Sequence, residues 1–337
     1  MKKIIEGLSG DIPLMMNRQG RCRSIQGRIS ENSISVILLS VLFCLCISCS
    51  HEKRTKIDTK RFSKVELKDT AAEKPVNIGV AAMLSPKYAL PAYGEIVTYL
   101  GKKLGIPAKM LFTQDYSSMN EMVKSHKVLA AFVCSGPYVN GHDEWGMELI
   151  AAPVLYGSNS YFSYIIVNKT SNYNSLNDLE GKKFAFTDPQ SNTGKLVPQY
   201  ELALMHKTPE TFFSDYIYTG SHDKSIEAVA EGLVDGAAVD NLIWEYLNRK
   251  TPAFTSKTKI ISKLGPFCMP PFVTYPDCDP AIKAKLKDAL INMDKDAEGK
   301  RILGELFIDR FEPVDDDCYK SIREMNEWIN ALSKKQN

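Results

Sequence analysis

The segment Thr187–Pro198, which reads T-D-P-Q-S-N-T-G-K-L-V-P, decides how the surrounding chain is interpreted. An apolar run at residues 183–186 precedes it and is typical of a buried strand. After it, Val197, Tyr200 and Leu204 have the spacing of one helix face. A strand, a small polar turn and a helix start leave unpaired backbone N–H groups at the positive end of the helix dipole. The segment therefore predicts a strand–turn–helix unit whose turn can hold an anion.

The side chains of the turn fit this role. Ser191, Asn192 and Thr193 supply hydrogen-bond donors, and Gly194 lets an anion approach the backbone closely. Lys195, the cation beside them, is expected to stay solvated rather than to bind the anion. The alternative is that Ser191 or Thr193 only caps the following helix.

Strand and helix patterns alternate along the rest of the chain, which predicts an α/β fold with mainly parallel sheets. Strands are predicted at residues 76–83, 108–112, 128–133, 161–167, 183–187, 215–219, 236–239 and 259–262. Helices are predicted at 89–104, where Gly105 would end the helix, at 115–124, at 175–181, from 223 onward, around 282–293 and at 319–332.

Two segments are expected to connect two lobes. The small polar residues 156–160 would carry the chain into a second lobe, and the Pro-rich residues 266–273 would return it to the first. We assign residues 76–158 to the first lobe, 159–255 to the second, and 256–337 to the return into the first lobe and the C-terminal helices.

Composition gives no support for a nucleic-acid-binding surface. The chain has 337 residues, of which 24% are charged, and its net charge is +2. Residues 1–48 hold six of the 42 basic and three of the 40 acidic residues, which leaves 36 and 37 in the remainder. The body is therefore close to neutral, and any anion site in it must be local.

The N-terminus has the pattern of an export signal. Four arginines precede an apolar run, Ile34–Ile47, that is too short to span a bilayer comfortably. Residues 46–49, C-I-S-C, resemble the bacterial lipobox, in which the last cysteine, here Cys49, receives lipid. We expect a lipoprotein signal at residues 1–48 and a flexible tether at 49–75, with an uncleaved anchor or plain secretory cleavage as alternatives.

The four cysteines of the body, Cys134, Cys268, Cys278 and Cys318, do not form a C-x-x-C pair. A metal site or a thioredoxin-like motif is therefore disfavoured. One or two disulfides are possible in an oxidising compartment, as are free buried thiols, and the pairing does not follow from the sequence.

Five segments together resemble a known family. They are Gln114-Asp115-Tyr116, S-G-P-Y at 135–138, D-L-E-G-K-K-F-A-F-T-D-P-Q-S-N-T-G at 178–194, G-S-H-D at 220–223, and V-D-G-A-A-V-D at 234–240. In this order and spacing, residues 76–314 resemble the periplasmic phosphate/phosphite/phosphonate-binding proteins of ABC transporters, the PhnD-like branch of the type 2 solute-binding proteins.

The resemblance implies a two-lobed clamshell that closes on an oxyanion. It places the hydroxyl run at Ser191, Asn192 and Thr193, although Asn192 stands where many members have Ser or Thr. The full set of ligand-binding residues that it implies is Tyr116, Ser135, Tyr138, Ser191, Asn192, Thr193, Gly194, His222 and Asp240.

Each of these residues also has a purely structural interpretation. His222 could form an N-cap pair with Asp223, and Asp240 could cap the following helix. Tyr116 and Tyr138 could be ordinary core or surface tyrosines. Ser135 and the glycine after it could only form a tight turn.

The sequence departs from those family members that take aminoalkyl phosphonates and hold the ammonium group with carboxylates. The return segment 266–271 has no acidic residue, and Leu242 stands where one of those carboxylates would be expected. Asp240 alone would be a weak counterion. We therefore expect a ligand without a free amine, such as phosphate, phosphite or a small alkyl phosphonate.

The predicted function is binding without chemistry, with no cofactor and no metal. We expect a monomeric, lipid-anchored, extracytoplasmic component of an ABC importer that delivers a phosphorus oxyanion to a membrane permease. One alternative is a receptor lipoprotein of the same fold that signals to a separate sensor kinase. An esterase using Ser191, His222 and Asp240 is disfavoured, because no G-x-S-x-G elbow is present and Ser191 lies in the anion turn.

Overall fold

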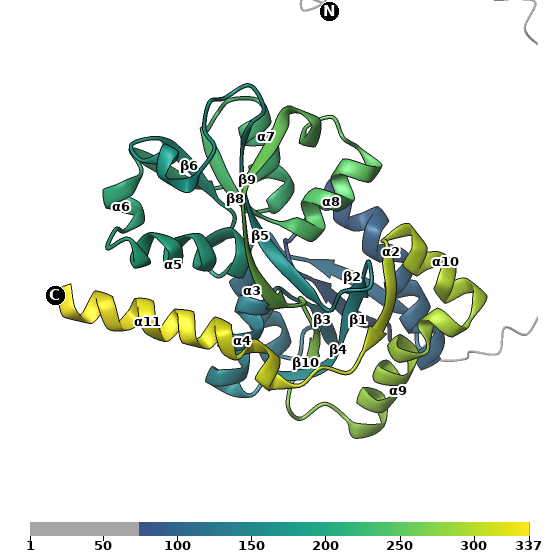
Figure 1. Ribbon diagram of the computed structural model, residues 1–337. Coiled ribbons are helices and arrows are strands. Elements are labelled where there is room, and N and C mark those ends of the chain that lie inside the picture. Colours follow the sequence, from purple (N-terminus) through teal and green to yellow (C-terminus); the bar gives the residue numbers. More distant parts are fainter. Residues whose placement is uncertain (1–73, 337) are drawn as a thin grey trace, which may run out of the picture. The chain divides into compact units, whose positions relative to one another are not determined.

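Two β-sheets flanked by helices form the body of the protein (Figure 1). The computed structural model describes residues 74–336, with side chains to residue 332. The first sheet has the order β11-β4-β10-β3-β1-β2 and the second β7-β6-β8-β5-β9. The strands of the first sheet are β1 (Val76–Val80), β2 (Ala108–Phe112), β3 (Ala130–Phe132), β4 (Glu148–Leu155), β10 (Phe272–Thr274) and β11 (Ile308–Glu312). Those of the second are β5 (Ser160–Asn168), β6 (Lys183–Phe186), β7 (Asp215–Tyr218), β8 (Gly236–Asp240) and β9 (Thr258–Cys268).

Most strands in each sheet point in one direction. In the first sheet β1 pairs in parallel with β2 and β3, and β10 is antiparallel to both β3 and β4, so β4 runs the same way as β3. In the second sheet β6 pairs in parallel with β7 and β8, and β5 is antiparallel to both β8 and β9. The expected mainly parallel sheets are confirmed in strand direction, but β10 and the edge strand β11 in the first sheet and β5 in the second make the pairing mixed.

The helices follow the predicted pattern with several additions. Those associated with the first sheet are α2 (Pro86–Leu104), α3 (Tyr116–Lys124), α4 (Ser135–Trp145), α9 (Pro280–Ile291), α10 (Ala297–Glu305) and α11 (Lys320–Gln336). Those associated with the second are η2 (Leu176–Leu179), η3 (Asn192–Leu196), α5 (Val197–Leu204), α6 (Pro209–Phe212), α7 (His222–Ala230) and α8 (Asn241–Lys250).

Helix α2 shows why the sequence specifies these elements. Pro86 occupies its first turn, Ile96 and Leu100 are fully buried, and Gly105 ends it in the left-handed conformation with φ of 75°. Proline is favoured at a helix start and glycine just after a helix end, so both boundaries are encoded locally.

The chain passes between the two sheets at two adjacent places. It leaves β4 and enters β5 through residues 156–159, and it returns from β9 to β10 through residues 269–271. Ser160 pairs with Cys268 in the second sheet, so the two crossings lie side by side. Because β9 belongs to the second sheet, the return follows Cys268, later than the boundary at residue 256 that we expected.

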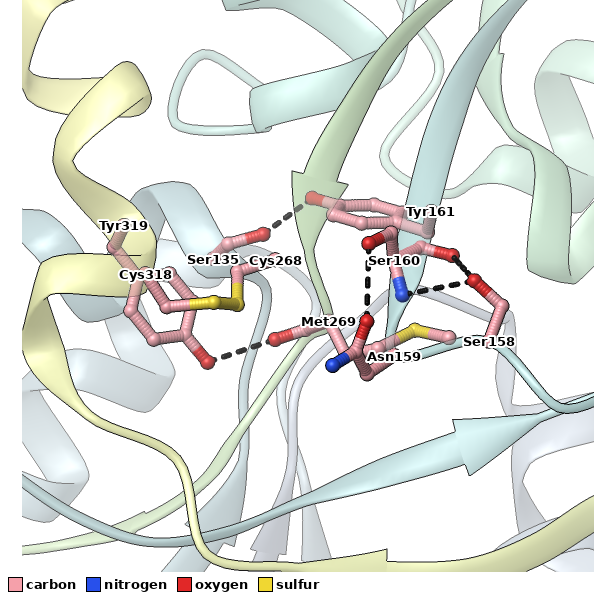
Figure 2. Close-up of a disulfide and its surroundings, with 9 residues drawn as sticks. All are labelled: Ser135, Ser158, Asn159, Ser160, Tyr161, Cys268, Met269, Cys318 and Tyr319. Atoms are coloured by element: carbon pink, nitrogen blue, oxygen red, sulfur yellow. Dashed lines mark hydrogen bonds between the residues drawn. A yellow bond between two sulfur atoms is a disulfide. The ribbon is translucent and has the colours of Figure 1, made fainter.

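A disulfide fixes the C-terminal segment beside the return crossing (Figure 2). Cys268 and Cys318 are bonded with a Cα–Cα distance of 5.7 Å, and Cys134 and Cys278 are free and buried. The hydroxyl of Tyr319 donates to the carbonyl of Met269 over 2.8 Å. The base of α11 is therefore attached to the segment that joins the lobes.

None of the helices between residues 74 and 336 is long and apolar enough to cross a membrane. The predicted signal at residues 1–48, the predicted lipidation site at Cys49 and nearly all of the predicted tether lie outside the described residues.

Candidate functional site

Four helix starts, the ends of strands β6 and β8, and the start of β5 bring polar side chains together between the sheets. Helices α3 and α4 begin in the first lobe, whereas η3 and α7 begin in the second lobe (residues 160–268), where β8 also ends. The group of fully or almost fully buried side chains that results, called the polar cluster below, consists of Tyr116, Ser135, Tyr161, Thr187, Ser191, Asn192, Thr193, Ser221, His222 and Asp240. Helix starts carry unpaired N–H groups and partial positive charge, so their convergence favours an anion.

Tyr161 joins the two lobes within this cluster. The amide Nδ2 of Asn192 donates to the Tyr161 hydroxyl over 3.0 Å, and the Ser135 hydroxyl forms a short hydrogen bond with the same atom (Figure 2). Burial raises the pKa of Tyr161 well above its usual value, so its hydroxyl stays protonated. The predicted residues Ser135 and Asn192 therefore meet through a tyrosine that was predicted only as part of a strand.

His222 is held as a neutral ring with its hydrogen on Nε2. The backbone N–H of Asp240 donates to Nδ1 over 3.0 Å, and the Thr187 hydroxyl lies 3.0 Å from the same nitrogen. A neutral imidazole that accepts at Nδ1 carries its hydrogen on Nε2. Burial lowers the pKa of His222 to about 3, because the charged ring would lose its hydration. Nε2–H therefore donates to the Tyr116 hydroxyl oxygen over 3.4 Å, which joins the two lobes and leaves the hydroxyl hydrogen of Tyr116 to donate elsewhere.

The turn that opened the sequence analysis both caps a helix and leaves polar atoms unpaired. The Ser191 hydroxyl accepts from the N–H of Gly194 over 3.0 Å, so the predicted capping role exists. Three buried atoms, Asn192 Oδ1, Thr193 Oγ1 and Ser221 Oγ, have no hydrogen-bond partner within residues 74–336. A buried polar group without a partner costs about 1–3 kcal/mol, so such a group in a native site requires an explanation. An oxygen-rich ligand would accept from the two hydroxyls.

Two glycines allow close packing around this turn. A Cβ on Gly136, in the first turn of α4, would lie 2.3 Å from the carbonyl oxygen of Gln190 across the lobe boundary. A Cβ on Gly194 would lie 2.5 Å from the Thr187 hydroxyl oxygen. Gly194 is thus required by its contact with Thr187, while close approach of an anion to its backbone stays a prediction.

Carboxylates of the second lobe bind backbone N–H groups of the first. Asp188 accepts from the N–H of Tyr116 over 3.1 Å, and Asp223 accepts from the N–H of Ser85 over 2.8 Å. Burial raises the pKa of Asp188, although its backbone hydrogen bonds oppose the shift. These contacts hold the lobes together around the polar cluster at the starts of α2 and α3.

Asp240 ends β8 and caps α8. One carboxyl oxygen accepts from the N–H of Leu242 over 2.7 Å, so the predicted structural role is present. Burial raises the pKa of Asp240 to about 7 against the opposing effect of hydrogen bonds from the α8 backbone. The carboxylate is not hydrogen bonded to His222, which instead receives the backbone N–H of Asp240. This arrangement differs from a hydrolase triad, in which a carboxylate orients the imidazole.

Two residues discussed in the sequence analysis, Tyr138 and Lys195, lie outside the polar cluster. The hydroxyl of Tyr138 donates to Asp316 over 2.7 Å, and its ring packs 4.6 Å from that of Tyr319, so the structure does not bring this predicted residue to the site. Lys195 is half-buried, and burial lowers its pKa while attraction to Glu210 opposes the shift. Lys195 therefore interacts electrostatically with Glu210.

Sequence reasoning missed Tyr161, Thr187 and Ser221 as members of the cluster. Thr187 ends a predicted strand, and Ser221 precedes His222, so their positions at a strand end and a helix start were available signals. Cys134, directly before α4, also lies beside the site, with its sulfur 4.0 Å from the Tyr161 hydroxyl. Burial raises the pKa of the Cys134 thiol to about 11, which leaves it unreactive.

Comparison with known proteins agrees with this geometry. Residues 78–319 match the family described as the periplasmic substrate-binding protein of phosphonate ABC transporters. The phosphonates-binding periplasmic protein of Escherichia coli K12 is 28% identical over 239 residues, which cover 69% of this chain and 70% of the relative. The probable phosphite-binding protein PhnD1 of Prochlorococcus marinus is 26% identical over 182 residues, covering 50% of this chain and 61% of the relative.

Solved structures show the same fold. A binding protein of a Pseudomonas aeruginosa phosphonate transporter superposes with a TM-score of 0.74 and 25% identity, over 79% of this chain and 89% of the other. The methylphosphonate complex of Prochlorococcus marinus PhnD1 gives a TM-score of 0.70 at 21% identity, over 76% and 98%. The family match spans most of the chain, and the related proteins are named as binding components rather than enzymes. The chain belongs to the family of extracytoplasmic substrate-binding proteins of phosphonate ABC transporters.

Proposed function

We propose that this protein is a lipid-anchored receptor that captures a phosphonate, phosphite or phosphate oxyanion in the polar cluster and delivers it to its membrane permease. The observation that carries the proposal is the pair of buried hydroxyls at Thr193 and Ser221, which have no hydrogen-bond partner within residues 74–336 and belong to the same polar cluster as the neutral ring of His222. All three lie at helix starts, where an anion is stabilised.

The donors are arranged to replace the hydration shell of a tetrahedral oxyanion. The hydroxyls of Tyr116 and Ser135 come from the first lobe, and those of Thr193 and Ser221 come from the second. The cluster contains no lysine or arginine, so binding relies on neutral donors and helix dipoles. A ligand held this way needs both lobes, and the closed form is what the permease would recognise.

Asp240 can form a hydrogen bond with an oxyanion in either protonation state of its carboxyl group. With a pKa raised to about 7, its carboxyl group can donate to a fully ionised oxygen or accept from a protonated one. This supports phosphate, phosphite or an alkyl phosphonate, as expected from the sequence.

Titration calorimetry of the purified full-length chain with phosphate, phosphite and methylphosphonate tests the proposal. The sharpest variant is Thr193→Val, which replaces an unpaired hydroxyl by a methyl group of the same shape. We expect its affinity for the preferred oxyanion to fall at least tenfold, since a hydrogen bond to a charged group contributes about 1.5–3 kcal/mol. Its unfolding free energy without ligand should stay unchanged or rise, because no protein hydrogen bond is lost.

Thr274→Val is the matched control. Thr274 is also fully buried, but its hydroxyl donates to the Leu129 carbonyl over 2.7 Å. This variant should lose stability and keep its affinity. Equal affinity of Thr193→Val and wild type for every oxyanion that binds would contradict the proposed site.

Attachment to the membrane through Cys49 is part of the same proposal. We expect the protein to take up radiolabelled palmitate in a bacterial host and to partition with membranes, and a Cys49→Ser variant to do neither. Membrane partitioning of that variant without label would instead indicate an uncleaved anchor.

A further inference from the structure

Helix α11 contacts both lobes. It runs past α4 of the first lobe and alongside α5 of the second, and it packs against both helices (Figure 1). Its first half is anchored to the first lobe, whereas its distal half meets the second. The helix therefore connects two elements that move relative to each other when the lobes of a hinged protein open.

The first half of α11 is fixed by several kinds of contact. The disulfide described above holds its base at the return crossing. Nε of Arg323 donates to both carboxylate oxygens of Asp143 in α4 over 2.9 Å, and Nη2 donates to Asp316 over 2.8 Å. On the other face of this half, Ile322 and Met325 are buried in the core of the first lobe. This half of the helix must move with the first lobe.

The distal half of α11 packs on α5 through apolar side chains. The ring of Trp328 lies edge-on to that of Tyr200, with centroids 5.2 Å apart and an interplanar angle of 70°. Ile329 and Leu332 line a small cavity of about 60 Å³ together with Ala203 of α5. These contacts lie about two or more helical turns beyond the start of α11 at residue 320.

Helix α5 continues directly from the turn that belongs to the polar cluster. It begins at Val197, immediately after η3 (Asn192–Leu196). Leu196 and Val197 are buried in the same hydrophobic cluster as Ile322 of α11. Helix α4, on which the anchored half rests, begins at Ser135 in the first-lobe part of the polar cluster. Helix α11 thus spans the two helices whose starts face each other in that cluster.

Opening of the lobes must break the contacts of the distal half. The two crossings between the lobes lie beside the base of α11, and displacement in a rotation increases with distance from its axis. Trp328 lies well away from this base, so a rotation that carries α5 away from α4 separates its ring from Tyr200. A contact that is present in the closed form and lost in the open form stabilises the closed form.

We propose that α11 is a latch that holds the lobes closed over the bound ligand, with Trp328 as the positioning residue that fastens it to α5. The inference rests on the proposed function for the ligand used to measure it, whereas closure is a property of the lobes themselves. The latch engages only after the lobes have closed. It therefore slows release of the ligand without changing how fast the ligand enters the open cleft.

Trp328→Ala in the full-length chain tests the latch. The ligand is whichever of phosphate, phosphite and methylphosphonate binds most tightly, and its release is followed by phosphorus NMR exchange. The dissociation rate should rise at least fivefold, because an aromatic pair contributes more than its buried area alone. The association rate, obtained from the dissociation rate and the calorimetric affinity, should change less than twofold.

Tyr200→Ala completes a double-mutant cycle. It should accelerate release to a similar extent, and the double variant should release the ligand no faster than the faster single variant. Each substitution removes the same ring contact, so the two effects should not add.

Trp244→Ala is the matched control. Trp244 is also half-buried and meets a tyrosine edge-on, since its ring centroid lies 6.2 Å from that of Tyr164. Its indole N–H donates to the Thr258 hydroxyl over 3.1 Å. All three residues belong to the second lobe, so this variant should lose stability in urea without faster release.

Release from Trp328→Ala at the wild-type rate, or an equal increase in Trp244→Ala, would overturn the latch while leaving the oxyanion site intact. If the wild-type chain binds none of the oxyanions, the proposed function itself fails. Small-angle X-ray scattering without ligand then decides the latch: Trp328→Ala should have a larger radius of gyration than wild type, and equal radii would reject it.

Discussion

His222 and Asp240 have opposite pKa shifts although both are fully buried. Burial lowers the pKa of the His222 ring to about 3 and raises that of the Asp240 carboxyl to about 7. In each case the charged form loses hydration, so both residues favour the neutral state. The site therefore consists of uncharged hydrogen-bond donors, which can bind an anion without a buried negative charge opposing it.

These shifts predict opposing contributions to the pH dependence of stability. The stability that comes from the neutral His222 ring is fully present above pH 6.5 and is lost as the pH falls toward 3. The Asp240 contribution is complete below pH 3.8 and is lost as the pH rises toward 7. Between about pH 4 and 6.5 the two slopes, each at most about 1.4 kcal/mol per pH unit, largely cancel.

Single substitutions should reveal the pH dependence that each residue gives to the unfolding free energy, measured by urea unfolding at pH 4.5 and 6.0. Relative to wild type, His222→Gln should lose stability as the pH rises over this interval, whereas Asp240→Asn should gain it. Asparagine can still cap α8, which separates the titration from the capping role. Parallel pH profiles for wild type and both variants would show that these two groups do not titrate as described.

At the scale of single elements, the start of α4 in the first lobe packs closely against the turn of the second lobe that carries Gln190. Gly136 lies in its first turn, and any Cβ there would meet the Gln190 carbonyl at 2.3 Å. Gln190 belongs to the turn that carries Ser191, Asn192 and Thr193. The absence of a side chain at residue 136 therefore controls how closely α4 and this turn approach.

Gly136→Ala should leave the protein folded and weaken oxyanion binding by about a hundredfold or more, because the turn must move away from α4. Gly94→Ala is the matched control, since Gly94 lies within α2 and nothing stands within 4 Å of an added Cβ. It should raise stability by about 1 kcal/mol through helix propensity and leave affinity unchanged. The comparison is made by calorimetry and urea unfolding, and full affinity in Gly136→Ala would contradict the contact.

Local signals explain which elements the sequence predicted. Strand β2 begins and ends at the predicted residues 108 and 112, and Gly105 ends α2 as expected. Helix α4 was not predicted, and a tight turn was only the alternative interpretation of its first two residues; its sequence S-G-P-Y-V-N-G-H contains two glycines and a proline, which do not favour a helix. Its formation depends on tertiary contacts, such as the hydrogen bond from Asn120 to the Pro137 carbonyl, that no local pattern reports.

The site residues also divide into those that local patterns predicted and those whose role depends on tertiary contacts. The helix-start residues Asn192 and His222 were predicted from turn chemistry and from the family resemblance, and the structure brings them together. Tyr161 was missed because its role depends on Ser135 and Asn192, each more than 20 residues away. Tyr138 was misplaced relative to the cluster because the sequence does not reveal that its hydroxyl reaches Asp316.

At the scale of the whole body, hydrogen bonds between the lobes join them without any ligand. Asp223 accepts from the Ser85 N–H, and Asp188 accepts from the Tyr116 N–H. Each bond joins a second-lobe carboxylate to a helix start of the first lobe. These bonds should slow reopening and therefore govern how long the ligand stays bound.

Asp223→Ala should raise the ligand dissociation rate about tenfold with little change in the association rate, as measured by stopped-flow fluorescence. Asp235→Ala is the control, because Asp235 accepts from the Lys183 N–H over 2.9 Å within the second lobe. That variant should lose stability without faster release. Equal dissociation rates for wild type and Asp223→Ala would show that this bond does not restrain opening.

The pairing of Ser160 with Cys268 has a consequence for the evolution of such receptors. The second lobe, residues 160–268, begins and ends at neighbouring points of the first lobe. It therefore has the topology of a domain inserted into the first lobe, with its two ends side by side. Such a segment can be exchanged between homologous genes as a cassette without rebuilding the host half. Ligand selectivity could then change when the second lobe is replaced by recombination, while the surface of the first lobe is inherited unchanged.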